Sequence, residues 1–72
     1  MKLSEAETLS AGDMIHHKTI TNADGTPMRF KVTSVKTWKT RPGEIRIGIK
    51  RGLYEYFHLN QYDLDPYDLG SE

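Results

Sequence analysis

The feature that most constrains the fold is the segment EIRIGIK, residues 44–50. Isoleucine occupies every second position from Ile45 to Ile49, with arginine and glycine between. A period of two places alternate side chains on opposite faces, so this segment is predicted to be a β-strand with one buried face. Turn signals flank it, because Arg41-Pro42-Gly43 favours a type II turn and Arg51-Gly52 a tight hairpin. A strand between two tight turns predicts an antiparallel sheet.

Three further segments have strand-like patterns: residues 14–20, 28–36 and 53–59. Asp24-Gly25 predicts a turn between the first two, because glycine accepts a positive φ without a Cβ clash. In the second segment, Val35 falls out of phase with the apolar positions before it, which predicts a bulge near Ser34.

The two ends of the chain carry weaker signals. Ser4 and Glu7 have the spacing of a capping box, so the N-terminal segment is either a single helical turn or a flexible lead-in. Asn60 followed by Asp63 favours a helical or 3₁₀ turn, and Pro66 prevents a longer helix. A short closing strand is expected around Leu64, Tyr67 and Leu69.

A chain of 72 residues is expected to form a single domain, since one so short buries only about 60% of its unfolded surface. The absence of cysteine excludes disulfides and thiolate metal sites and fits a reducing compartment. No stretch approaches the roughly 18 apolar residues of a membrane span, and the N-terminus lacks the apolar core of a signal peptide. We therefore expect a cytoplasmic protein without a membrane partner.

Four or five short strands joined by tight turns are expected to roll into a small antiparallel barrel, because a flat sheet would leave one face and both edges uncovered. The predicted fold class is thus all-β. The strand spacing and the pattern Leu9, Gly12-Asp13, Ile15 resemble the SH3-like barrel superfold over about residues 9–69, with flexible ends. This superfold hosts many functions, so the resemblance implies no activity. The Trp38 connection and the acidic tail are also similar to those of small phage and prophage proteins.

Charge is divided along the sequence although the chain is neutral overall. From Arg29 to Arg51 there are eight Lys or Arg and one acid, whereas from Tyr54 onward there are five acids and no Lys or Arg. Four of the basic residues lie at outward positions of two neighbouring strands, and the intervening loop adds two cations and a tryptophan. Rings beside cations can stack with single-stranded bases, so DNA or RNA is one predicted partner. The predicted nucleic-acid or partner-binding residues are Arg29, Lys31, Trp38, Lys39, Arg41, Arg46, Lys50, Tyr54 and Tyr56.

Other interpretations compete with this one. Lys and Arg on exposed strands also prevent aggregation, and the basic strands can pair with the acidic segment 63–72. The aromatic residues can form a protein–protein interface, or Trp38 can simply cap the core. An uncovered strand edge would allow homodimerisation by strand addition, and the oligomeric state stays open. The neutral net charge weighs against strong non-specific binding to nucleic acid.

Catalytic and metal-binding motifs are missing from the sequence. His16 and His17 point to opposite faces of a strand and cannot easily share one ion. The acids Asp63, Asp65 and Asp68 lack the spacing of an EF-hand. No phosphate-binding loop, nucleophile elbow or HExxH motif occurs. We therefore expect a non-enzymatic binding module with no catalytic residue, metal or cofactor.

Overall fold

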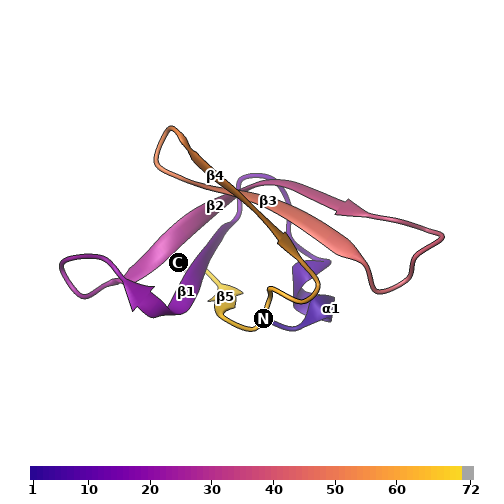
Figure 1. The fold of residues 1–72 in the computed structure, drawn as a ribbon, viewed down its shortest axis with the longest axis horizontal. Coiled ribbons are helices and arrows are strands. Elements are labelled where there is room, and N and C mark those ends of the chain that lie inside the picture. Colours follow the sequence, from indigo (N-terminus) through magenta and orange to yellow (C-terminus); the bar gives the residue numbers. More distant parts are fainter. Residues whose placement is uncertain (71–72) are drawn as a thin grey trace.

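The computed structural model describes residues 1–70 and contains one short helix and a single five-stranded sheet (Figure 1). The elements are α1 (Leu3–Ala6), β1 (Met14–Thr21), β2 (Pro27–Thr37), β3 (Ile45–Arg51), β4 (Glu55–Asn60) and β5 (Tyr67–Leu69). Neighbouring strands are antiparallel throughout, in the order β4-β3-β2-β1-β5. The predicted all-β fold class is confirmed. Within this part of the chain, no helix has the length and apolar character needed to cross a membrane.

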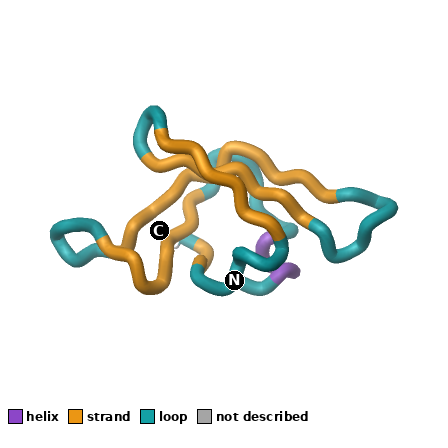
Figure 2. Tube along the Cα trace, in the orientation of Figure 1, coloured by secondary structure: helices purple, strands orange, loops and turns teal. Residues whose placement is uncertain are grey.

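The sheet is rolled but stays open between its two edge strands. β2, β3 and β4 arch over α1 and β5, and the three hairpin connections project away from the arch (Figures 1 and 2). β4 and β5 are the edges, and no pairing joins them within residues 1–70. In a closed barrel, pairing of β4 with β5 would enclose the apolar face of the sheet. Here, side chains from outside the sheet cover part of that face. These side chains are Met1, Ala6, Leu9 and Leu64.

The core lies on the concave side of the sheet and follows the alternation read from the sequence. Ile45, Ile47 and Ile49 are fully buried, and Val32 lies opposite Ile49 in the neighbouring strand. Burial of one such side chain stabilises the fold by about 1.5–3 kcal/mol. The buried hydrophobic set is Met1, Ala6, Leu9, Ile15, Phe30, Val32, Ile45, Ile47, Ile49, Leu59 and Leu64.

The predicted bulge in β2 is confirmed. Two residues, Thr33 and Ser34, occupy the space opposite Gly48, and the register shifts between Val32 and Ser34. The extra residue returns Val35 to the core side of the sheet. A Cβ at Gly48 would lie 2.7 Å from the hydroxyl oxygens of both Thr33 and Ser34, which is why the strand carries glycine here.

The turn before β3 agrees with the prediction, and the turn after β3 differs from it. Gly43 has a φ of 89°, and the N–H of Glu44 donates to the carbonyl of Arg41 at 3.1 Å, as a type II turn requires. The connection from β3 to β4 is one residue wider than the expected two-residue hairpin. Leu53 and Tyr54 therefore lie in this connection and are not part of the strand.

The N-terminal segment is part of the core. Helix α1 follows Lys2, whose N–H donates to the Glu5 carboxylate at 2.8 Å. The helix starts earlier than the expected box at Ser4, so that capping prediction is wrong. The α-amino group of Met1 is buried and donates to the carbonyl of Leu64 at 3.1 Å. A contact between the first residue and the segment before β5 closes the concave side of the sheet.

The inward-facing histidine shapes a bend in β1. His17 is buried, and its Nδ1 accepts hydrogen bonds from the N–H groups of Thr19 at 3.1 Å and Ile20 at 3.0 Å. Since Nδ1 accepts both bonds, the neutral ring carries its proton on Nε2. The ring also meets Tyr67 edge-on, with centroids 5.0 Å apart. His17 is thus a buried residue whose ring nitrogen has hydrogen-bond partners, and, as expected, His16 points to the other face.

Candidate nucleic-acid interface

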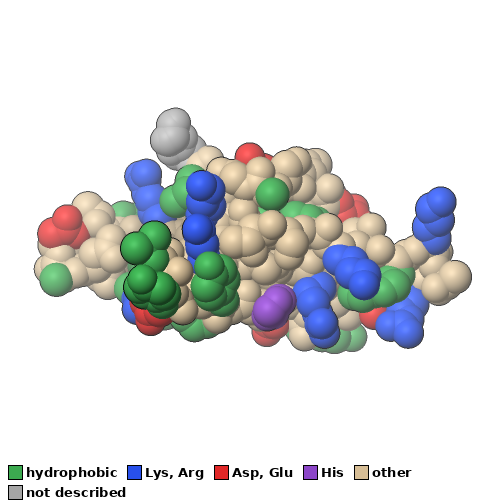
Figure 3. Space-filling view, turned by 90° about the horizontal axis from the view of Figure 1, so that it is seen from above, with side chains coloured by type: hydrophobic (Ala, Val, Ile, Leu, Met, Phe, Trp, Pro, Cys, Tyr) green, Lys and Arg blue, Asp and Glu red, His purple; other side chains and the backbone are tan. Residues whose placement is uncertain are grey.

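Five basic side chains share the convex face of the sheet. They alternate with the buried positions of β2 and β3 and so project to the opposite side. Lys31 lies opposite Lys50, and Lys36 lies opposite Arg46. Arg29 extends the group toward β1. We define these five residues as the basic face, and Figure 3 shows Lys and Arg side chains distributed along this side of the molecule.

The basic face places like charges directly against each other. Opposed side chains of an antiparallel pair have Cβ atoms about 4.5–5.5 Å apart, where like charges are destabilising. None of the ion pairs within residues 1–70 includes a member of the basic face. Nearby acids have other partners, since Glu44 pairs with Arg41 at 3.6 Å and Glu55 with Arg51 at 2.6 Å. Among residues 1–70, the positive charge of this face is therefore uncompensated.

The basic face has two rows, Lys31 with Lys50 and Lys36 with Arg46, and small and aromatic side chains lie between and beside them. Gly48 lies in register with Ser34 on one side and His58 on the other, and Tyr56 lies beside Lys50. The rows are four residues apart along β3, which corresponds to about 13 Å. Tyr56 is 60% exposed, and His58 is also exposed. The middle of the face is thus low, with two exposed rings along β4.

The β2–β3 connection places an aromatic ring and more cations at one end of the basic face. Trp38 is half-buried and lies outside the buried core cluster. The Nζ of Lys36 lies 5.4 Å from its ring centroid, and the guanidinium carbon of Arg41 lies 5.8 Å away. Such contacts contribute about 0.5–1 kcal/mol at exposed sites. Lys39 is exposed in the same connection. Three cations therefore lie near this end of the basic face, and two of them, Lys36 and Arg41, lie against the Trp38 ring.

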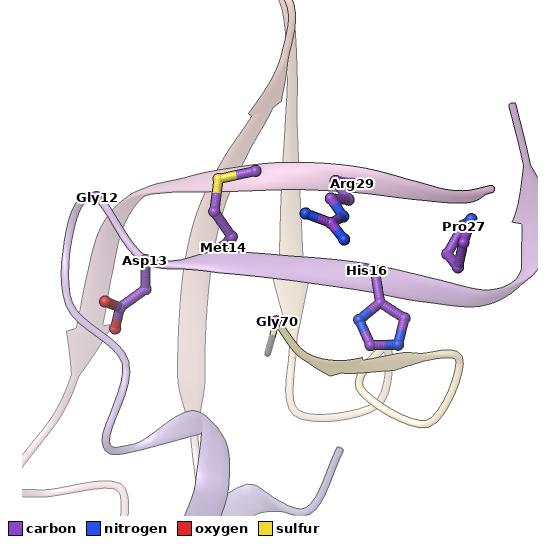
Figure 4. Close-up of a pocket in the computed structure, with 7 residues that line it drawn as sticks. All are labelled: Gly12, Asp13, Met14, His16, Pro27, Arg29 and Gly70. Atoms are coloured by element: carbon purple, nitrogen blue, oxygen red, sulfur yellow. The ribbon is translucent and has the colours of Figure 1, made fainter. Parts of the chain in front are cut away.

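An open pocket continues the basic face over β1. It has a volume of about 510 Å³ and is lined by Arg29 and His16, which face each other across the β1–β2 ladder, and by Met14 and Pro27 (Figure 4). In Figure 4 the Arg29 side chain extends from β2 toward β1, and His16 lies below it. The remaining lining residues are Gly12, Asp13 and Gly70. A guanidinium beside an imidazole provides donors for a phosphate oxygen.

The acidic C-terminal segment does not cover the basic face in the part that the structure describes. β5 pairs with β1 at the far edge of the sheet, because the apolar positions of this segment pack there. Asp68 lies 3.8 Å from Lys18 and 4.0 Å from His16, and the Asp63 carboxylate accepts the N–H of Asn60. The expected pairing of the acidic segment with the basic strands is therefore absent for residues 63–70, and residues 71–72 lie outside the described chain.

The structure gathers most of the predicted site residues and separates one. Arg29, Lys31, Arg46, Lys50 and Tyr56 share the convex face, and Trp38, Lys39 and Arg41 lie at its end. Tyr54 lies apart in the β3–β4 connection and is 88% exposed.

Sequence reasoning missed Lys36, His16 and His58 as members of this surface. The sequence signal that indicates an outward position for Lys36 is the phase change at Val35. A bulge that returns Val35 to the core also turns Lys36 outward.

A second exposed feature surrounds β4. Eight large hydrophobic side chains are exposed within residues 1–70, and five of them lie between residues 53 and 62. Phe57 faces the concave side and is 43% exposed. It lines a cleft of about 260 Å³ whose other residues are Ile20, Met28, Phe30, Arg51 and Tyr67.

Comparison of the chain with protein-family models gave no match, and searches of the curated proteins and of the solved structures gave none either. Its own side chains must therefore support any assignment of function.

Proposed function

We propose that this protein is a non-enzymatic module that binds single-stranded nucleic acid on its basic face. The observation that carries this proposal is the two like-charge pairs that the register of β2 and β3 places opposite each other, Lys31 with Lys50 and Lys36 with Arg46. Like charges placed directly opposite each other destabilise the free protein, and within residues 1–70 no acid pairs with these four residues. A polyanion lying across β2 and β3 would replace this repulsion with attraction and release its own counterions.

The position of the cations argues against a role limited to solubility. Lysines that protect a sheet from aggregation are found on edge strands. Here the basic face lies on β2 and β3, which both have a paired strand on each side, whereas β4 and β5 at the edges carry no Lys or Arg. Lys36 lies beyond the end of the β1–β2 pairing and Arg29 beyond the end of the β2–β3 pairing, but the other three members of the basic face lie where their strands are paired on both sides and so protect no edge.

The arrangement of rings and cations favours a single strand over a duplex. Cations fix the phosphates, and exposed rings provide surfaces on which bases stack. His58 lies beside the low strip at Gly48, between the two basic rows, and Tyr56 lies at the β4 end of the Lys31–Lys50 row. Bases can therefore stack along β4 with phosphates at the rows on either side. Reading a duplex commonly requires a helix or ribbon that enters a groove, and the convex face presents a broad sheet surface.

A salt titration tests this proposal. Binding of fluorescent single-stranded and duplex oligonucleotides is measured by anisotropy over a range of salt concentrations. If five phosphates contact the basic face, log K against log salt for the single strand has a slope of about −3.5. Arg46→Gln is expected to reduce the magnitude of that slope by about 0.7. Lys18→Gln removes the same charge from a residue that already faces Asp68, so it is the matched control and should leave the slope nearly unchanged.

The Tyr56→Ala variant distinguishes the contribution of base stacking to the binding free energy from the contribution of charge. Loss of one stacking ring is expected to weaken single-strand binding by about 1–3 kcal/mol per base without changing the salt slope. Absence of binding at about 50 mM salt, where phosphate contacts are strong, would contradict the proposed function. Tighter binding to the duplex than to the single strand would contradict the stacking mode.

The strand order places the first strand between the second and fifth, which is consistent with an open form of the SH3-like arrangement. We propose that relationship as a description of fold, since this superfold is compatible with many binding functions. The similarity to small phage and prophage proteins and a cytoplasmic location stay predictions.

A further inference from the structure

The free edge of β4 lacks the features that usually prevent strands from pairing with other chains. Such edges commonly carry Lys, Pro or a bulge. β4 is six residues long, contains no Lys or Pro, and pairs with β3 without a register shift. Its one charged residue, Glu55, is held by Arg51 at 2.6 Å. The other edge strand, β5, has three residues, so β4 is the longer and more regular edge.

Exposed hydrophobic side chains lie at both ends and in the middle of β4. Leu53 and Tyr54 precede the strand and are 73% and 88% exposed, and Tyr62 follows it and is 84% exposed. Phe57 lies in the middle of the strand. A two-fold antiparallel pairing brings the start of one strand to the end of the other. Leu53 and Tyr54 of one copy would therefore meet Tyr62 of the other, and this contact would occur twice.

We propose that β4 pairs antiparallel with β4 of a second copy to form a two-fold dimer. A register centred on Phe57 keeps the apolar sides of both sheets on the same side of the joined sheet. This register places Phe57 against Phe57 of the second copy, and Tyr56 against His58. Each pair then joins aromatic rings across the new ladder, as stabilising cross-strand pairs do.

The exposed area is sufficient for such an interface. With about 200 Å² for a large side chain, the exposed fractions of Leu53, Tyr54, Phe57 and Tyr62 amount to roughly 600 Å² per copy. Stable interfaces bury about 800 Å² per partner, and the backbone of β4 supplies the rest. The area at this edge therefore fits a second copy of the chain.

Electrostatics do not oppose the dimer. The Lys50 residues of the two copies would be separated by three strand spacings, about 14 Å. That distance exceeds the Debye length of about 8 Å at physiological salt, so their repulsion is screened. The dimer does not depend on nucleic-acid binding, and its test contains no oligonucleotide.

Sedimentation velocity over about 1–500 µM protein tests the dimer, because this range brackets micromolar dissociation constants. We expect the wild-type chain to convert from one to two copies as concentration rises. Leu53→Lys places a charge on an exposed position of the interface and is expected to raise the dissociation constant about tenfold or more. Leu69→Lys makes the same change on β5 and should leave it unchanged. Thermal unfolding of each variant verifies that it folds.

A cysteine substitution tests the register. The chain contains no cysteine, so one introduced thiol can form a disulfide only with a second copy. Directly opposed residues have Cα atoms about 4.5–5.5 Å apart, within the range that a disulfide spans. Phe57→Cys is expected to cross-link rapidly on mild oxidation, and Leu69→Cys slowly. A wild-type monomer at the highest concentration, equal weakening by Leu53→Lys and Leu69→Lys, or equal cross-linking at the two positions would each overturn the proposal.

Discussion

Neutralising Lys50 should make the free protein more stable and its complex with nucleic acid weaker. Lys50 lies opposite Lys31 on one side and Tyr56 on the other, and forms no ion pair within the described chain. Lys50→Gln removes the charge and keeps a polar side chain of intermediate length. If Lys50 belonged to an intramolecular ion pair, the same substitution would lower stability. The sign of the salt-dependent part of the change in unfolding free energy therefore distinguishes the two situations.

The magnitude follows from Coulomb's law. At an ammonium separation of about 7 Å and an effective dielectric constant of about 40–80, the repulsion is about 0.6–1.2 kcal/mol before screening. At about 10 mM salt, where the Debye length is about 30 Å, roughly 0.5–0.9 kcal/mol of it survives. At about 1 M salt, with a Debye length of about 3 Å, it falls to about 0.1 kcal/mol. A low-salt gain of this size raises Tm by roughly 2–7 °C for a domain of this length.

Urea or thermal unfolding of the wild type and of Lys50→Gln at both salt concentrations measures the effect. The lysine stem also packs on the sheet, and its loss is independent of salt, so the difference between the two salts isolates the charge. Lys18→Gln is the matched control, since Lys18 lies 3.8 Å from Asp68 and its loss should lower stability slightly at low salt.

The same variant should bind nucleic acid less tightly. Loss of one phosphate contact is expected to lower the magnitude of the single-strand salt slope by about 0.7. If the stability of Lys50→Gln relative to the wild type were no higher at low salt than at high salt, or if the variant bound oligonucleotides as the Lys18→Gln control does, the reasoning from like-charge pairs would be refuted.

Three other predictions concern the fold. Ile47→Ala should lower the free energy of unfolding by about 3–4 kcal/mol, measured in urea, because Ile47 is fully buried. Burial, and secondarily the charge of Asp63, raises the pKa of Tyr67 above its ordinary value. The stabilisation from the neutral phenol is therefore complete below the unfolded pKa near 10 and is lost as pH rises through the folded pKa, so Tyr67→Phe should flatten the alkaline loss of Tm. Acetylation of the Met1 amine, which donates to Leu64, should lower stability by about 1–3 kcal/mol in calorimetry, because buried hydrogen bonds are lost.

Local patterns were sufficient to predict the strands of the sheet. The Ile45 to Ile49 alternation identified the buried face of β3, and the phase change at Val35 identified the bulge. The same patterns could not show that the sheet remains open between β4 and β5. That outcome depends on Met1 and Leu64 packing against the core, a contact between residues far apart in the sequence.

The sequence was sufficient to predict which types of residue form the candidate surface, but not which of them lie side by side on it. A basic stretch from Arg29 to Arg51 is evident in the sequence, yet which cations share a face depends on how β2 pairs with β3. The extra residue in β2 sets that pairing and brings Lys36 opposite Arg46. Arg51, although basic, lies on the other side of the sheet with Glu55. Sequence position alone therefore cannot separate the cations of the basic face from Arg41 and Arg51, which form ion pairs.

The distribution of charge over the strands connects the two proposals. Sheets that resist aggregation commonly carry charge, especially Lys, on their edge strands. This sheet has the reverse distribution: β2 and β3 carry cations that form no ion pair within the described residues, and exposed rings lie along the edge strand β4. Solubility alone would select neither feature, since one destabilises the free fold and the other promotes association. Both become favourable if the convex face binds a polyanion and the edge binds another protein strand, and the Lys50→Gln and Leu53→Lys variants test these two roles separately.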